Sequence, residues 1–305
     1  MSIKINSIKY KILKELTKDK KDGMKIYQVL NKKDDNIYVI KEISIKNEKN
    51  EIINIIAKEA EILSKFNHDN IVKYYGSSKT KEYFYILMEY CDSNDLRYFI
   101  NEQKDKSQLI EENNLYNIIM QICLGIKEIH DKNIIHRDLK PENIFLNKKY
   151  EVKIGDFGIS KEFFSYKQYT VTQNKQGTLH YAPPEILTGG KYNKKADIWS
   201  LGCIIYELLT LRIHFLDKIN EDIVKIDNNI YNAKWQTLID LLLEKQFDKR
   251  PDINTVINFL ITIIGKEIDE NSNYNLNNNI KIPKKLGRYE IILSNDKNLK
   301  TIYSK

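Results

Sequence analysis

The sequence predicts an α+β fold with two lobes, a small β-rich lobe that contains one helix and a larger α-helical lobe after it. Short segments rich in β-branched and aromatic residues fill most of the first ninety positions, as is typical of strands. Longer segments with apolar residues at helical spacing follow Cys91. With 305 residues and an apolar content of 42%, the chain can bury a sizeable core, which excludes a wholly disordered protein.

The first lobe is expected to contain four short strands and one helix. The strands are predicted at residues 10–16, 25–30, 36–43 and 83–89, with a turn rich in lysine and aspartate between the first two. Residues 51–66 carry apolar side chains at positions 52, 55, 56, 60, 63 and 66. This spacing is that of a helix with one packed face and one solvated face.

The second lobe is expected to contain helices at residues 115–129, 196–211, 235–243 and 253–264. The first of these is long and mostly apolar, which predicts a central core element. Short strands and a polar loop lie between the first two helices, and the hinge between the lobes is predicted near residues 89–95. Six of the nine residues from 271 to 279 are asparagine. We therefore expect residues 269–305 to be a linker and a tail of unknown role.

Composition narrows the class of protein further. The cysteines at 91, 123 and 203 form no close pair, so neither a disulfide scaffold nor a CxxC metal site is expected. The chain has no apolar run long enough for a membrane span and no signal peptide at its start, so we expect an intracellular protein, cytoplasmic or also nuclear. The net charge of +7 comes mostly from lysines of the first ninety residues and the tail. It is therefore weak support for nucleic-acid binding.

The segment IIHRDLKPENIFL, residues 134–146, carries the most specific chemical signal. It places Asp138 and Asn143 five residues apart, with Lys140 between them, and DFG begins thirteen residues later at Asp156. Two carboxylates and an amide on adjacent loops suit a metal–triphosphate site, because Mg²⁺ takes oxygen ligands and phosphate oxygens complete its shell. A carboxylate that does not bind the metal can orient and deprotonate a hydroxyl nucleophile.

In these motifs the sequence resembles the eukaryotic protein kinases of the serine/threonine type. The resemblance implies a bilobal protein-kinase-like fold over residues 8–265, with a small lobe at about 8–90 and a large lobe at about 91–265. It also implies transfer of the γ-phosphoryl group of ATP to a protein hydroxyl, with Mg²⁺ as cofactor. The expected partner is a protein substrate, with neither nucleic acid nor membrane, and the expected state is a monomer or a transient dimer.

The resemblance also implies residue roles at the reaction centre. Asp138 corresponds to the base that receives the hydroxyl proton, and Lys140 to the lysine that neutralises the transferring phosphoryl group. Asn143 and Asp156 correspond to the Mg²⁺ ligands. Lys41 of VIK corresponds to the lysine that holds the α- and β-phosphates. Its partner is predicted to be Glu59 rather than Glu61, which faces elsewhere on a helix.

Further positions bind the nucleotide in the family pattern. Met88 falls at the gatekeeper position, and the backbone of residues 89–91, from Glu89 to Cys91, is expected to bond adenine. Asp95 is placed to bond the ribose hydroxyls, and it can also cap the helix that begins with LRYFI.

The remaining family positions are structural or regulatory. The resemblance identifies HRDLKPEN, residues 136–143, as the catalytic loop, and it implies that Asp197 anchors this loop. It also implies a buried pair of Glu185 with Arg250, and contacts of Thr178 with Asp138 and Lys140. Arg137 is expected to receive a phosphate on the segment that follows DFG, because guanidinium and phosphate pair bidentately. The predicted phosphate acceptors are Thr170 and Thr172.

The nucleotide-covering loop departs from the family pattern. The stretch TKDKKDGMKIY has one glycine, Gly23, where the family has three, and lysines stand at 18, 20 and 21. Glycines let the backbone approach phosphates closely, so the loop predicts lower phosphate affinity and turnover than the family pattern gives. The alternative function is therefore a weakly active or inactive pseudokinase that serves as a binding or allosteric module.

Within the family, LMEYCDSNDL, HRDLKPENIFL and ELLTLRIHF resemble the NIMA-related kinases, and GTLHY also resembles the translation-initiation-factor kinases. The NIMA-related interpretation fits better because DIWSLGC precedes ELLTLRIHF. Asp95 and Glu142 are predicted to attract a basic residue upstream of the acceptor hydroxyl.

Overall fold

The computed structural model describes residues 2–17, 23–92, 94–147, 149–156, 180–190, 193–213, 225–227 and 229–264. The chain divides into two units after residue 265, and all described residues belong to the first unit. No helix in this described part is long and apolar enough to cross a membrane.

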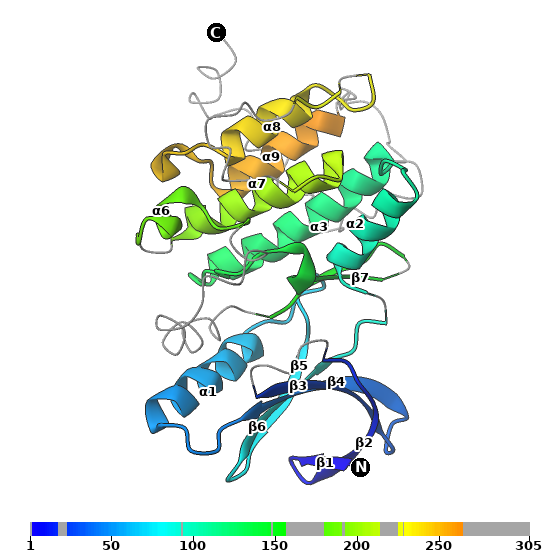
Figure 1. Ribbon diagram of the computed structural model, residues 1–305, viewed down its shortest axis with the longest axis vertical. Helices are drawn as coiled ribbons and strands as arrows, with labels where there is room; N and C mark the ends of the chain where they lie inside the picture. Colours follow the sequence, from blue (N-terminus) through cyan, green and yellow to red (C-terminus); the bar gives the residue numbers. More distant parts are fainter. Residues whose placement is uncertain are drawn as a thin grey trace, which may run out of the picture. The chain divides into compact units, whose positions relative to one another are not determined.

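A curled antiparallel sheet forms the first part of the chain (Figure 1). Its strand order is β1-β2-β3-β4-β6-β5. The strands are β1 (Ser2–Ile5), β2 (Ile8–Glu15), β3 (Met24–Asn31), β4 (Asn36–Ser44), β5 (Tyr74–Lys79) and β6 (Tyr83–Glu89). Alternate residues point into the curl and pack together, among them Ile5, Val29 and Ile40, which are almost fully buried.

Four of these strands were predicted from their β-branched and aromatic residues, with ends that differ by at most two residues. The strands β1 and β5 were missed. The sequence of β1, SIKI, is only four residues long, and that of β5, YYGSSK, contains glycine and two serines. The first is too short to be recognised and the second has weak strand propensity, and pairing with β2 and β6 determines their conformation.

Helix α1 (Asn50–Ser64) packs against β5 and β6. Its buried face includes Ile56, Ala60 and Leu63, which the apolar spacing predicted, and also the charged residue Glu59. The helix ends at Ser64, two residues earlier than expected. Glu61 lies on the exposed side, where it pairs with Lys65.

The second part of the chain is mainly helical. It contains α2 (Leu96–Asp105), α3 (Glu112–Asp131), α6 (Pro184–Leu187), α7 (Lys194–Thr210), α8 (Lys234–Leu242) and α9 (Ile253–Ile264). Helix α7 is buried at every residue from Ala196 to Leu209, and it contacts both α3 and α8 (Figure 1). A Cβ on Gly202 would lie 2.8 Å from Leu242 Cβ, so this glycine allows α7 and α8 to approach closely.

A short hairpin of β7 (Ile144–Leu146) and β8 (Val152–Ile154) links the two parts. The backbone of Ile154 bonds to Asn70 and Val72, which lie between α1 and β5. This pairing places the end of β8 beside the sheet. The residues that immediately precede β7 and follow β8 are those that carry the catalytic motifs.

Candidate active site

The β7–β8 hairpin brings the HRDLKPEN and DFG motifs together. Asn143, in the short 3₁₀ helix Pro141–Asn143, directly precedes β7, and Gly155 directly follows β8. Gly155 N–H donates to the Asn143 carbonyl at 2.9 Å, and Asn143 Nδ2 donates to the Asp138 carbonyl at 2.7 Å. Asp138 and Asp156 are eighteen positions apart in the sequence. The hairpin and these two bonds nevertheless place both residues at the same end of the hairpin.

Asp197, near the start of α7, holds the catalytic loop by its backbone. One carboxylate oxygen accepts the N–H of His136 at 2.8 Å and the other accepts that of Arg137 at 3.0 Å. His130 Nε2 of α3 bonds the same carboxylate at 2.9 Å. Arg137 has a φ of 69°, a strained value for a non-glycine residue, and these bonds stabilise it. This is the contact that the sequence predicted for Asp197.

His136 forms a second support that the sequence did not predict. Its Nε2 lies 3.1 Å from the Gly155 carbonyl, and its Nδ1 accepts the N–H of Asp138 at 3.3 Å. Burial lowers the pKa of His136, against the opposing effect of the Asp197 and Asp138 carboxylates. A neutral ring with the proton on Nε2 satisfies both bonds. His136 thus connects the catalytic loop to the residue before Asp156.

The predicted base and its neighbouring lysine are in direct contact. Lys140 Nζ lies 3.0 Å from Asp138 Oδ2, and the side chains are 19% and 12% exposed. A carboxylate with limited access to solvent, next to an ammonium group, is suited to orient one hydroxyl group. The ammonium group is also suited to bind the phosphoryl oxygens that approach that hydroxyl.

Lys41 of β4 joins the two lobes through a buried ion-pair network. Its Nζ lies 2.8 Å from Glu59 Oε1 of α1 and 2.7 Å from Asp156 Oδ1. Burial lowers the pKa of Lys41, but the Asp156 and Glu59 carboxylates outweigh it and the net shift is upward. The lysine therefore remains a cation, and the sequence-based choice of Glu59 over Glu61 matches the observed contact.

The two carboxylates respond differently to this shared cation. Burial raises the pKa of Glu59, and Lys41 offsets that increase only in part. Burial also acts to raise the pKa of Asp156, but Lys41 outweighs it and the net shift is downward. The Asp156 side chain, which is 41% exposed, is therefore the ionised and accessible carboxylate of the network.

The donor set fits Mg²⁺ bound to a nucleotide. Because Asn143 Nδ2 is used by the Asp138 carbonyl, its amide oxygen is the atom left for a metal. Asp156 offers an anionic oxygen, and it directly follows Gly155, whose backbone N–H donates to the Asn143 carbonyl. One amide oxygen and one carboxylate are a typical protein contribution to Mg²⁺ that also binds substrate phosphates and water.

Comparison with known proteins agrees with this geometry, since the protein kinase domain family matches residues 22–267. The chain belongs to the protein kinase family. Among its relatives, mouse Nek3 is 40% identical over 208 residues, which cover 66% of this chain and 40% of Nek3. Mouse Nek1 is 36% identical over 228 residues, or 72% of this chain and 19% of Nek1.

The Nek2 of Dictyostelium discoideum, named a probable serine/threonine kinase, is 31% identical over 247 residues. That match covers 77% of this chain and 58% of the relative. These relatives confirm the predicted resemblance to the NIMA-related kinases. The chain spans less than two thirds of the length of each of these relatives.

The predicted nucleotide-binding positions of the kinase domain lie at the end of β6. Met88 is half-buried between Val39 of β4 and Tyr74 of β5. Glu89, the last residue of β6, accepts bonds from Lys73 N and Lys153 Nζ. Burial raises the pKa of the Cys91 thiol to about 12, so it is not a thiolate at neutral pH.

Asp95 and Gly23 are two further residues that the sequence predicted to bind the nucleotide. Asp95 Oδ1 accepts the N–H of Tyr98 at 2.8 Å, which is the predicted cap of α2. Gly23 has a φ of 65°, and its carbonyl accepts the N–H of Ser44 at 2.8 Å. A glycine at this position avoids the strain that a side chain would cause.

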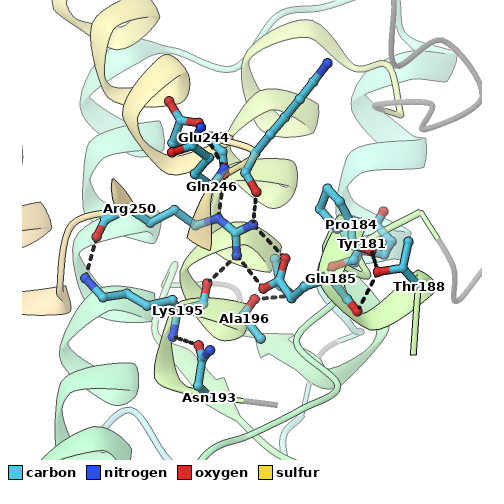
Figure 2. A network of polar contacts seen from close by, with 12 residues as sticks. Tyr181, Pro184, Glu185, Thr188, Asn193, Lys195, Ala196, Glu244, Gln246 and Arg250 are labelled. Carbon is cyan, nitrogen blue, oxygen red and sulfur yellow. Dashed lines mark hydrogen bonds and ion pairs between the residues drawn. The ribbon is translucent and has the colours of Figure 1, made fainter. Parts of the chain in front are cut away.

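The predicted pair of Glu185 with Arg250 is the centre of a larger network (Figure 2). Both guanidinium Nη atoms lie 2.8 Å from the Glu185 carboxylate, and the remaining donors reach the carbonyls of Lys195, Glu244 and Lys245. The Arg250 side chain is fully buried and lies over the Trp199 ring. This network connects α6, α7 and the segment before α9.

Arg97 of α2 forms a second network that the sequence did not predict. Its guanidinium binds Glu142 of the catalytic loop, Glu207 of α7 and the hydroxyl of Tyr181. These residues are far apart in the sequence, and none belongs to a motif with the other three. Only the folded structure shows their association.

Some predicted residues lie outside the described part of the chain. They are the phosphorylation candidates Thr170 and Thr172, the contact residue Thr178, the Phe157 and Gly158 of DFG, the loop lysines 18, 20 and 21, and the tail.

Proposed function

We propose that the chain is an ATP-dependent protein serine/threonine kinase. The main support for this proposal is that polar groups from both lobes, of the kinds that phosphoryl transfer needs, lie together in one site. Lys41 pairs with Glu59 and Asp156, and Asp138 pairs with Lys140 beside Asn143. The Nek relatives, which are named serine/threonine kinases, support the class of acceptor.

In the proposed reaction, Asp138 orients the substrate hydroxyl and accepts its proton. The hydroxyl oxygen forms a bond to the γ-phosphorus as the bond from that phosphorus to the β,γ-bridging oxygen breaks, and ADP leaves. Lys140 binds the oxygens of the transferring group, and Lys41 holds the phosphates that remain on ADP. Asn143 and Asp156 would hold Mg²⁺, which neutralises phosphate charge when bound. Catalysis in this scheme is mainly positioning and charge neutralisation.

A matched pair of variants tests the proposal. Asp138→Asn removes the proton acceptor, and Asp240→Asn makes the same change at an exposed site on α8. We expect label from γ-³²P-ATP to enter a generic protein substrate with the wild type and Asp240→Asn. Asp138→Asn should lose at least about 100-fold, the usual range for a general base. Equal activity of all three proteins would reject the assigned role of Asp138.

The alternative is a pseudokinase that binds nucleotide without turnover. It is favoured by the single Gly23 in a loop where the family has three glycines. Against it, Lys41, Glu59, Asp138, Asn143 and Asp156 are all present, and a pseudokinase usually lacks at least one of them. Thermal stabilisation by Mg²⁺-ATP without any phosphoryl transfer would favour this alternative.

We also propose activation by phosphorylation of Thr170 or Thr172. The support for this proposal is Arg137, which directly precedes Asp138. The Asp197 carboxylate accepts the backbone N–H of Arg137 and so fixes its position. A phosphate on the segment that follows DFG would form charge-assisted hydrogen bonds with this guanidinium. Mass spectrometry of active protein should find phosphate on one of the two threonines, and full activity with both unmodified would reject this proposal.

Residues 8–265 are the proposed catalytic unit, and residues 269–305 are a proposed extension. The proposed partner is a protein substrate that meets the kinase as a monomer or a transient dimer.

A further inference from the structure

Arg97 binds three groups that come from three other segments. Its Nε donates to Glu142 Oε1 at 2.8 Å, and Nη1 and Nη2 bind the two carboxylate oxygens of Glu207. Its Nη2 also donates to the Tyr181 hydroxyl, which in turn donates to Glu207 Oε2 at 2.5 Å. Four hydrogen bonds thus use most of the donor capacity of one guanidinium group.

Burial makes this cation necessary to Glu207, one of the two carboxylates. The Glu207 side chain is only 2% exposed, whereas Arg97 is 19% and Glu142 is 42% exposed. Burial lowers the pKa of Arg97, but its bonds to Glu207 and Glu142 outweigh this and raise it overall. With Arg97 the three side chains carry a net charge of −1, and without it the site would carry −2. The site formed by Glu142, Glu207 and Tyr181, called here the acidic site, is therefore built to hold one guanidinium.

The acidic site lies within reach of a bound substrate chain. Glu142 lies four residues after Asp138, in the same loop, and directly precedes Asn143. Four residues of extended chain span about 13–14 Å, so a side chain within about four positions of the acceptor can reach from Asp138 to Glu142. Glu142 is also one of the two residues predicted from the sequence to attract a basic residue upstream of the acceptor. In the structure, however, the Glu142 carboxylate is already bound by Arg97.

We propose that Arg97 is a specificity-determining residue, which fills the acidic site from within the chain and so prevents the kinase from selecting substrates with arginine or lysine near the acceptor. The inference rests on the proposed kinase function, since it concerns the substrate of that same site. Arg97 acts by occupying the site, and it takes no part in the transfer of the phosphoryl group. The expected substrates have neutral residues, rather than basic ones, within four positions of the acceptor hydroxyl.

The first test compares the wild type with Glu142→Gln on matched peptides. Each peptide has one threonine acceptor and either arginine or glutamine at one position within four residues of it. The ratio of kcat/KM for the arginine and glutamine peptides is the quantity measured. If Arg97 occupies the site, this ratio differs by less than about twofold between the two proteins at every position. A fall of more than about threefold in Glu142→Gln would show that substrate binds Glu142, and would overturn the inference.

The second test empties the acidic site. Arg97→Ala should lower KM for the arginine peptide about tenfold at one position, as expected for one hydrogen-bonded ion pair worth about 1.4 kcal/mol. The KM for the glutamine peptide should change less than about threefold, and a merely structural defect would instead lower kcat for both peptides. A folded Arg97→Ala protein with no such gain at any position would overturn the inference.

Two control variants separate occupancy from other effects. Arg97→Lys keeps a cation in the acidic site and should show no gain for the arginine peptide. The double variant Arg97→Ala with Glu207→Gln removes the buried carboxylate, so it should lose most of the gain. If Arg97→Ala does not fold because Glu207 is left unpaired, Arg97→Gln takes its place, because its amide can still donate to Glu207 but carries no charge. It should show the same gain for the arginine peptide, and a folded Arg97→Gln protein without that gain would overturn the inference.

Different experimental results would contradict this inference and the proposed kinase function. A folded wild type that phosphorylates neither the arginine nor the glutamine peptides, nor a generic protein, contradicts both. An active wild type whose preference for arginine depends on Glu142 contradicts the inference alone.

Discussion

Lys41 is a buried cation that pairs with two carboxylates from distant parts of the sequence, Glu59 and Asp156. Its side chain is 3% exposed, and that of Glu59 is 2% exposed. A buried pair of this kind adds little net stability, but removal of one partner leaves a buried charge without compensation. The network therefore holds α1 and Asp156 in one arrangement, which is a requirement of the proposed reaction.

Lys41→Ala is expected to abolish phosphoryl transfer, and to destabilise the sheet lobe by about 3–5 kcal/mol because Glu59 loses its cation. The large lobe should stay folded. The measurement combines a transfer assay with urea unfolding, and Lys65→Ala, which removes an exposed partner of Glu61, is the matched control. Full activity of Lys41→Ala would refute the assignment of this lysine.

His136 makes the stability of the kinase domain depend on pH. Its pKa is lowered in the folded state, so the folded protein holds the ring neutral while the unfolded chain accepts a proton. The contribution is present above pH about 6.5 and is lost as the pH falls through the lower folded-state pKa. Because one proton is involved, the free energy of unfolding changes by at most about 1.4 kcal/mol per pH unit.

Urea unfolding at pH 7.5 and pH 5.5 measures this effect. The wild type should lose stability between the two values, and His136→Asn should lose less because it removes the group that titrates. An equal loss in both proteins would show that His136 does not contribute to the pH dependence.

At the scale of elements, β1 closes the curl of the sheet, although the family match begins only at residue 22. Ile3 and Ile5 point into the curl and pack with the core of the other strands. Ile5→Ala should cost about 2–4 kcal/mol, because Ile5 is only 1% exposed. Ile37→Ala, at a position of β4 that is 40% exposed, should cost less than about 1 kcal/mol. Equal unfolding midpoints in urea for the two variants would contradict this role of β1.

Helix α7 positions the catalytic loop through one carboxylate. Asp197→Asn keeps the size of the side chain but replaces one of the two acceptor oxygens that bind the His136 and Arg137 N–H groups. We expect kcat to fall by at least about tenfold, with a smaller change in the KM for ATP, since a misplaced loop affects the reacting groups more than nucleotide binding. A steady-state assay measures both, and an unchanged kcat would contradict the anchoring role.

Sequence patterns predicted the parts of the site that are local. Asp138, Lys140, Asn143 and Asp156 stand in two contiguous motifs. The spacing of Glu59 from His68, which matches the family pattern, favoured Glu59, and Glu61 would face elsewhere on the helix. The pair of Arg97 and Glu207 was not predicted. An isolated arginine is typical of a solvated helix face, and the sequence around Glu207 offers no cation that could pair with it. Their pairing depends on tertiary structure alone. The strand β1 also depends on tertiary structure, because its four residues form a strand by pairing with β2.

At the scale of the whole molecule, the kinase domain combines residues from both lobes in the candidate active site. The hairpin of β7 and β8 brings Asn143 and Asp156 together, α7 fixes the loop before it, and β4 supplies Lys41. The positive charge noted in the sequence lies on the sheet lobe and the tail, while residues 91–268 carry 24 basic and 25 acidic residues. The acidic site with its own Arg97 belongs to this nearly neutral part.

Phosphoryl transfer from ATP is the most direct test of the central claim. Purified chain with Mg²⁺ and a generic protein substrate should incorporate label from γ-³²P-ATP on serine or threonine, and none from α-³²P-ATP. A folded chain that is stabilised by Mg²⁺-ATP, yet transfers no γ-label under any tested condition, would contradict the account.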